Sequence, residues 1–185
     1  LIEDNMEFAQ QQLRFAFDEI DYAIVNESPE SRAKREKNGW GELTNPRNSE
    51  PDGTLNLVPS KDWTSGFFPG TLWYTYELTG DNALKTQAVK YTNMLNPVRY
   101  YTGTHDLGFM INCSYGNAKR LSPNDTISAV MVETAENLCS RFNEPIGAIR
   151  SWDFGTWNFP VIIDNMMNLD LLFTASKMTG NPKYK

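Results

Sequence analysis

Helical periodicity is the feature that most limits the folds open to this chain. Between Ile2 and about Asn26, apolar residues recur at steps of three and four, as in an amphipathic helix. Residues 84–95 and 127–142 repeat that pattern, whereas residues 64–79 and 161–178 are apolar on nearly every side, which is typical of buried helices. No segment shows convincing period-two alternation, so we expect few strands. Buried and half-buried helices therefore alternate along the sequence.

Short sequence signals predict where these helices begin and end. Gly80 is placed for a left-handed cap after one helix, and Pro97 marks the end of the next. Ser122 is expected to cap a helix whose first residue is Pro123. Residues 107–118 are expected to form a further, mixed helix. These boundaries divide the chain into about six helices.

Two long connections interrupt the helical pattern. Residues 27–62 are polar and rich in Pro, Asn, Ser and Gly, and we expect a long loop there, in which Arg32–Lys37 is a solvated helix end. Residues 143–160 form a second loop, rich in Gly, Pro and Trp. Loops as long as the first are usually functional or disordered.

An internal repeat supports a regular helical architecture. Leu72–Asp81 aligns without gaps with Leu172–Asn181, one hundred positions later. Alternating buried and amphipathic helices predict an inner ring of buried helices and an outer ring of amphipathic ones, which is an all-α fold of the (α/α)6 barrel type. Six helices make half of that ring and leave the inner helices poorly covered. We therefore expect residues 1–185 to be part of one barrel domain that is completed elsewhere.

Composition excludes several classes of protein. The chain has 17 Lys and Arg against 23 Asp and Glu, a net charge of -6, and no basic tract, so nucleic-acid binding is not expected. Two cysteines and one histidine cannot supply the four ligands of a structural zinc site. No run approaches the roughly 18 apolar residues of a membrane span. Cys113 and Cys139 are expected as free thiols, with a disulfide as the alternative.

Asp164 is the residue that most suggests chemistry. It lies near the start of an otherwise oily helix, where a carboxyl group must be paired, hydrogen-bonded or protonated. If burial favours its neutral form, Asp164 is a general acid. The alternative, with equal weight from spacing alone, is a first-turn acid that satisfies free backbone amides.

His105 and Asp106 open another buried-type helix. Asp106 alone has the usual position of a helix cap, and a single histidine is more often a satisfied loop residue than a catalyst. Both Asp106 and Asp164 begin inner helices, so both are expected at the same end of the barrel. Proximity of the two acids would favour the functional interpretation.

Aromatic residues are dense in the loops, with Trp63 and Trp152 among them. Several tryptophans at one barrel end favour a platform for a sugar ring, whereas any single one is as well explained by packing of the loop onto the barrel. Arg150 and Lys61 lie near these tryptophans in sequence and are candidates to neutralise an anionic ligand, although exposed cations are usually only solvated.

Three motifs together resemble glycoside hydrolase family 88, the unsaturated glucuronyl hydrolases. They are Asp62-Trp63-Thr64-Ser65-Gly66-Phe67-Phe68-Pro69-Gly70, His105-Asp106-Leu107-Gly108-Phe109 and Ile163-Asp164-Asn165-Met166-Met167-Asn168-Leu169. They follow the family's order, and the resemblance covers essentially the whole chain. It implies an (α/α)6 barrel, in agreement with the periodicity, and identifies this chain as the N-terminal half, because members are typically near twice as long.

The resemblance implies removal of the 4,5-unsaturated uronic acid from the non-reducing end of lyase-generated glycosaminoglycan fragments. Asp164 corresponds to the catalytic acid and Asp106 to a second essential acid. Trp63 and Trp152 fall at sugar-stacking positions, and His105 lies near the site. The implied reaction is vinyl-ether hydration: Asp164 gives a proton to C4, water adds at C5, and the resulting hemiketal opens. It needs neither a metal nor a cofactor.

Further substrate-binding residues in the family come from the other half of the barrel. The remainder of the barrel, from the rest of the chain or from a second chain, is therefore an expected partner, beside the oligosaccharide. Two alternatives stay open: an unsaturated rhamnogalacturonyl hydrolase acting on pectin fragments, and a non-catalytic sugar-binding barrel. The motif at residues 105–109 favours an unsaturated glucuronyl hydrolase over the pectin enzyme. The presence of both acids argues against a protein that only binds sugar.

The chain begins at Leu1 without a charged leader, which fits either a processed secretory leader or a trimmed end. For a polysaccharide-degrading protein we expect a periplasmic or secreted location, with the cytoplasm as the alternative.

Overall fold

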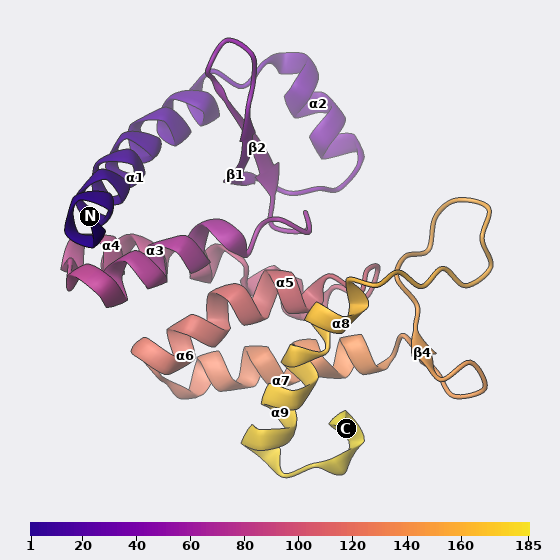
Figure 1. Ribbon diagram of the computed structural model, residues 1–185. Helices are drawn as coiled ribbons and strands as arrows, with labels where there is room; N and C mark the ends of the chain where they lie inside the picture. Colours follow the sequence, from indigo (N-terminus) through magenta and orange to yellow (C-terminus); the bar gives the residue numbers. More distant parts are fainter.

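The computed structural model describes all 185 residues, and helices dominate it (Figure 1). In chain order the elements are α1 (Ile2–Val25), α2 (Pro29–Lys37), β1 (Leu43–Ser49), β2 (Leu55–Pro59), α3 (Phe67–Thr79), α4 (Asn82–Met94), the 3₁₀ turn η1 (Asn96–Tyr100), α5 (Leu107–Ile111), the π-helical turn η2 (Asn112–Gly116), α6 (Asn117–Leu121), α7 (Asp125–Cys139), β3 (Phe142–Asn143), β4 (Ala148–Ile149), α8 (Asn165–Asn168), α9 (Asp170–Thr179) and the 3₁₀ turn η3 (Pro182–Tyr184). None of the helices is long and apolar enough to cross a membrane.

The helices form two layers, as the alternation predicts. One layer consists of α3, the α5–η2–α6 segment and α8–α9, which contact one another in that order. The helices α1, α4 and α7 pack against this layer. The core lies between the layers, where Leu72, Trp73, Leu107, Met131 and Leu138 are fully buried. Within the first of these layers, α5 and α8 contact each other.

The internal repeat is confirmed at the ends of α3 and α9. Both helices end in a left-handed glycine, Gly80 and Gly180, each with φ of 71°. The side chain of Asp81 then accepts hydrogen bonds from the first amides of α4. Asn181 does the same for the amide of Lys183 at the start of η3. The two copies of the repeat therefore form the same structure: the end of a helix, followed by a side chain that caps the next helical segment.

The helix end expected at Arg32–Lys37 is confirmed, but the long loop expected over the rest of residues 27–62 is wrong, because two paired strands lie there. Helix α2 covers the basic segment, and β1 pairs with β2 in an antiparallel hairpin. The register shifts between Leu43 and Asn45 and again between Pro46 and Asn48. Such bulges remove the period-two pattern by which a strand is found in a sequence. Figure 1 shows this hairpin and α2 on the same side of the molecule as α1.

Two predicted helices are also interrupted. The helix over 107–118 contains the π-turn η2, and the last helix begins at Asn165, later than expected. Just before it, the carbonyl of Pro160 accepts from the Ser151 amide, and the Ile162 amide donates to the Ser151 hydroxyl. These bonds hold the segment against the preceding loop, so helix geometry starts only after Asp164.

The cap of α7 is Asn124, and the predicted cap at Ser122 is wrong. The Asn124 side chain accepts from the Ile127 amide at 2.9 Å, whereas Ser122 ends α6. We expect Asn124→Ala to lower the free energy of unfolding by about 1 kcal/mol, because one helix amide loses its acceptor. Ser122→Ala is the matched control and should be near neutral. Chemical denaturation measures both, and an equal loss in the two variants would contradict this assignment.

Candidate active site

Close packing of α5 against α8 builds the site. Gly108 lies so near the α8 backbone that a β-carbon there would be 2.5 Å from Asn168 Cα. The Asn168 side chain fixes this contact, since its Oδ1 accepts from the Phe109 amide at 2.9 Å. Asp106 precedes α5 and Asp164 precedes α8, so this packing places the two acids at one end of the helical layer.

The two acids meet at His105, as their positions at helix starts led us to expect. His105 Nε2 lies 3.3 Å from Asp106 Oδ1 and 3.6 Å from Asp164 Oδ2. One donor or acceptor atom from each of the three side chains lies within 4.8 Å of the others. We call these three residues the acid trio. Because Nε2 faces both carboxyl groups at contact distance, the three side chains are close enough to share a proton.

Asp164 does not act as a helix cap. Although it stands at the cap position of α8, its carboxyl group accepts no hydrogen bond from the helix amides. Its Oδ1 is buried without a partner, while the side chain as a whole is about one-third exposed (34%). The structural alternative for Asp164, a first-turn acid satisfying backbone amides, is therefore wrong. The group is accessible and has unused hydrogen-bonding capacity.

Asp106 is held more firmly than Asp164. Its Oδ2 accepts a hydrogen bond from the Thr104 hydroxyl at 2.6 Å, and the Asp106 backbone amide donates to the Thr104 hydroxyl oxygen at 3.2 Å. Like Asp164, it makes no side-chain bond to the amides of its own helix. One carboxyl oxygen is thus fixed by Thr104 while the other faces His105.

His105 is buried, with only 2% of its surface exposed. Its Nδ1 lies 2.5 Å from Asn165 Oδ1, and its amide donates to the Ser151 carbonyl. Burial disfavours the charged ring, but the hydrogen bond and charge of Asp106, with the Asn165 bond and the Asp164 charge, outweigh it and raise the pKa of His105. Both ring nitrogens thus face protein groups, and a direct role of His105 in binding substrate stays a prediction.

The two tryptophans contact different residues of this region. Trp152 packs its edge against the His105 ring, with centroids 6.4 Å apart, and is stacked with Phe154. Trp63 is 43% exposed and contacts Phe109, which follows Asp106 by one helical turn. Both tryptophans therefore border elements that carry the acid trio.

Arg150 is not brought to the acid trio. Its guanidinium contacts Asp153, and it lines a polar cavity of about 350 Å³ together with Arg141. Neither acid nor His105 lines that cavity. Lys61, the other candidate cation, lies over the ring of Tyr101. Cys113 and Cys139 are free thiols, as expected.

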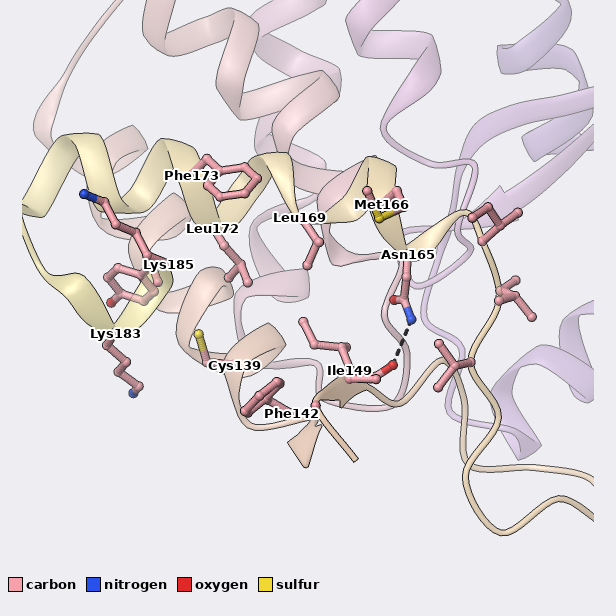
Figure 2. A pocket seen from close by; sticks show the side chains of 16 residues that line it. Cys139, Phe142, Ile149, Asn165, Met166, Leu169, Leu172, Phe173, Lys183 and Lys185 are labelled. Carbon is pink, nitrogen blue, oxygen red and sulfur yellow. Dashed lines mark hydrogen bonds between the residues drawn. The ribbon is translucent and has the colours of Figure 1, made fainter. Parts of the chain in front are cut away.

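A cavity of about 720 Å³ is also separate from the acids. It is mostly apolar, and neither Asp106 nor Asp164 lines it. Figure 2 shows Asn165 at its edge, with the Asn165 amide bonded to the Ile149 carbonyl and with Leu169 and Phe173 on the same side. Asn165 thus lies between this cavity and His105.

Sequence reasoning gave no role to Asn165, Asn168 or Gly108. Two asparagines three positions apart in an apolar segment indicate side chains with specific hydrogen-bond partners, because a buried amide needs such partners. Asn165 and Asn168 are both buried, and their side chains connect α8 to His105 and to α5. The role of Gly108 becomes visible only once α8 is placed against it.

Known proteins resemble the chain in sequence, although no family model matches it. It is 49% identical over 133 residues to an unsaturated glucuronyl hydrolase of Formosa agariphila, an alignment that covers 70% of this chain and 33% of that protein. An unsaturated chondroitin disaccharide hydrolase of Streptococcus agalactiae is 33% identical over 135 residues, 70% of this chain and 34% of that one. The chain thus spans about a third of the length of these curated relatives.

Solved structures of unsaturated glucuronyl hydrolases also resemble this chain. The crystal structure of an unsaturated glucuronyl hydrolase specific for heparin matches with a TM-score of 0.75 at 44% identity, over 96% of this chain and 44% of that one. The Streptococcus agalactiae unsaturated glucuronyl hydrolase matches with a TM-score of 0.69 at 30% identity, over 90% and 42%. The two helical layers are therefore part of an (α/α)6 barrel fold. By sequence and by fold, the chain belongs to the unsaturated glucuronyl hydrolases, glycoside hydrolase family 88.

Proposed function

We propose that the protein removes the 4,5-unsaturated uronic acid from the non-reducing end of lyase-generated glycosaminoglycan oligosaccharides by hydrating the vinyl ether. The observation that carries this proposal is the environment of the Asp164 carboxyl group. Its carboxyl group is accessible, does not cap its helix, and lies beside a second carboxyl and a buried histidine. A protonated carboxyl so placed can deliver a proton to a bound substrate.

The proposed chemistry divides the work between the two acids. Asp164 gives its proton to C4 of the unsaturated ring, which leaves positive charge on C5 and the ring oxygen. Asp106, fixed by Thr104, is a negative charge that stabilises this cation. Water then adds at C5 and loses a proton to Asp164, and the hemiketal opens to release the sugar. Trp63 and Trp152 supply aromatic faces beside the site.

The assay follows the ultraviolet absorbance of the C4=C5 double bond in unsaturated disaccharides from chondroitin and heparin. These substrates are chosen because relatives are named for chondroitin disaccharides and for heparin. We expect the absorbance to fall, with or without a chelator. Turnover of unsaturated rhamnogalacturonan fragments alone would instead support the pectin enzyme. Binding without turnover of any substrate would support a sugar-binding barrel.

We further propose that the remainder of the barrel packs against the apolar surface that this chain leaves open. Tyr74 and Leu78 of α3 are more than half exposed, as are Met166 and Phe173 in the α8–α9 segment. The apolar 720 Å³ cavity adjoins the latter. Exposed apolar area of this extent is typical of surfaces that receive further structure. We expect residues 1–185 alone to self-associate in light scattering, and a monodisperse monomer would contradict this.

A further inference from the structure

The ring of His105 is held in one tautomer. Asn165 Nδ2 donates to the Ile149 carbonyl at 2.8 Å (Figure 2) and lies 3.4 Å from the Ser151 hydroxyl. The other end of the amide, Oδ1, therefore faces the His105 ring. An amide oxygen can only accept, so Nδ1 of His105, 2.5 Å away, carries a hydrogen. His105 can therefore gain or lose a proton only at Nε2.

That nitrogen faces both acids of the proposed reaction. Ionised carboxylates only accept hydrogen bonds, so an unprotonated Nε2 would place its lone pair against two negative groups, at 3.3 Å and 3.6 Å. This repulsion is removed when the acid trio holds one proton, on Nε2, on Asp106 or on Asp164. All three groups lie close enough for this one proton to pass among them.

We propose that His105 is a positioning residue that stores this shared proton at Nε2 and keeps it available to Asp164. The inference rests on the proposed function, since it assigns a proton source to the same acid. His105 itself is buried, which leaves little of its surface for contact with a substrate. It acts through Asp164.

The proton transfer balances within the trio. The N–H bond at Nε2 breaks as an O–H bond forms at Asp164 Oδ2, and the ring becomes the neutral Nδ1–H tautomer that Asn165 already binds. Asp164 then gives the proton to C4. The water that adds at C5 releases one proton, which returns to the trio. No proton is gained or lost over a cycle, and no electron moves.

Only two titratable groups face the ring. They are Asp106, which is adjacent in sequence, and Asp164, which precedes α8. The other side chains against His105, those of Asn165 and Trp152, carry no charge. The alkaline limb of the activity profile should therefore report loss of the trio's shared proton.

The first test compares kcat/KM against pH for wild type, His105→Gln and Asn165→Asp. We expect His105→Gln to move the alkaline limb down by about one pH unit, because glutamine stores no proton. Asn165→Asp should move the limb up, because a negative charge beside Nδ1 favours the imidazolium. A uniform loss of rate with an unmoved limb in both variants would show a purely structural role and overturn the proposal.

The second test needs neither substrate nor a variant that folds well. Nitrogen-15 NMR of the wild-type imidazole, with His105→Gln used to assign the signal, should show Nδ1 protonated throughout and Nε2 titrating above the ordinary histidine range. A neutral ring protonated at Nε2 would overturn the proposal. The expected tautomer in a protein that turns over no unsaturated uronide would support the trio and overturn the proposed function, so the two failures are distinguishable.

Discussion

Replacing Asp164 with asparagine should abolish hydration of unsaturated disaccharides, with a loss in kcat of about 10³-fold. The amide keeps the size of the side chain but has no acidic proton to give to C4. The fold should survive, because Asp164 makes no capping bond and its Oδ1 has no partner. The measurement is the initial rate of absorbance loss, together with thermal unfolding of the same sample.

The matched control for this variant is Asp125→Asn. Asp125 is exposed at the start of α7, so it loses the same charge on the same kind of helix end. We expect its rate to stay within about twofold of wild type, because surface changes of this kind have small effects. Full activity in Asp164→Asn would remove Asp164 from the mechanism, and equal losses in the two variants would point to a general charge effect.

Replacing Gly66 with alanine should unfold much of the two-layer packing. A β-carbon at Gly66 would lie 2.2 Å from the Phe109 carbonyl oxygen and 2.4 Å from that of Met110. Both are backbone atoms of α5, so α3 and α5 must move apart. We expect a loss in the free energy of unfolding of about 3 kcal/mol. Activity should fall with it, because α5 carries Asp106 at its start.

Gly39→Ala separates this packing effect from the general cost of replacing a glycine. Gly39 has φ of +62°, and a β-carbon there meets no atom within 4 Å. Its replacement should cost only the left-handed strain, about 1 kcal/mol. Urea denaturation of the two variants measures the difference. A Gly66→Ala protein as stable as Gly39→Ala would contradict the close approach of α3 to α5.

The helical layers could be predicted from the sequence because burial imposes a period on helices. Segments apolar on nearly every side became the inner helices α3 and α9, and Gly80 and Gly180 within the repeat marked where these helices end. The hairpin β1–β2 could not be found in this way. Its two bulges break the alternation, and Pro46 lies within a strand, where proline is unexpected.

The acid trio was predictable only in part. Asp106 and Asp164 could be placed at one end of the barrel because both begin inner helices. The burial of His105 and its bond to Asn165 depend on how a loop and two helices meet, which no local pattern encodes. Arg150 was chosen for its proximity in sequence to tryptophans, and its partner is Asp153. Nearness along the chain does not fix the direction of a side chain.

The most direct test of the central claim asks which bond the site acts on. Matched O- and S-glycosides of the unsaturated uronic acid differ only in the atom that joins the sugar to its leaving group. If Asp164 protonates C4, the glycosidic atom takes no part in the first step, and both compounds should lose the double-bond absorbance at similar rates. Turnover of the O-glycoside alone would show that the glycosidic bond is attacked directly and would contradict hydration by the acid trio.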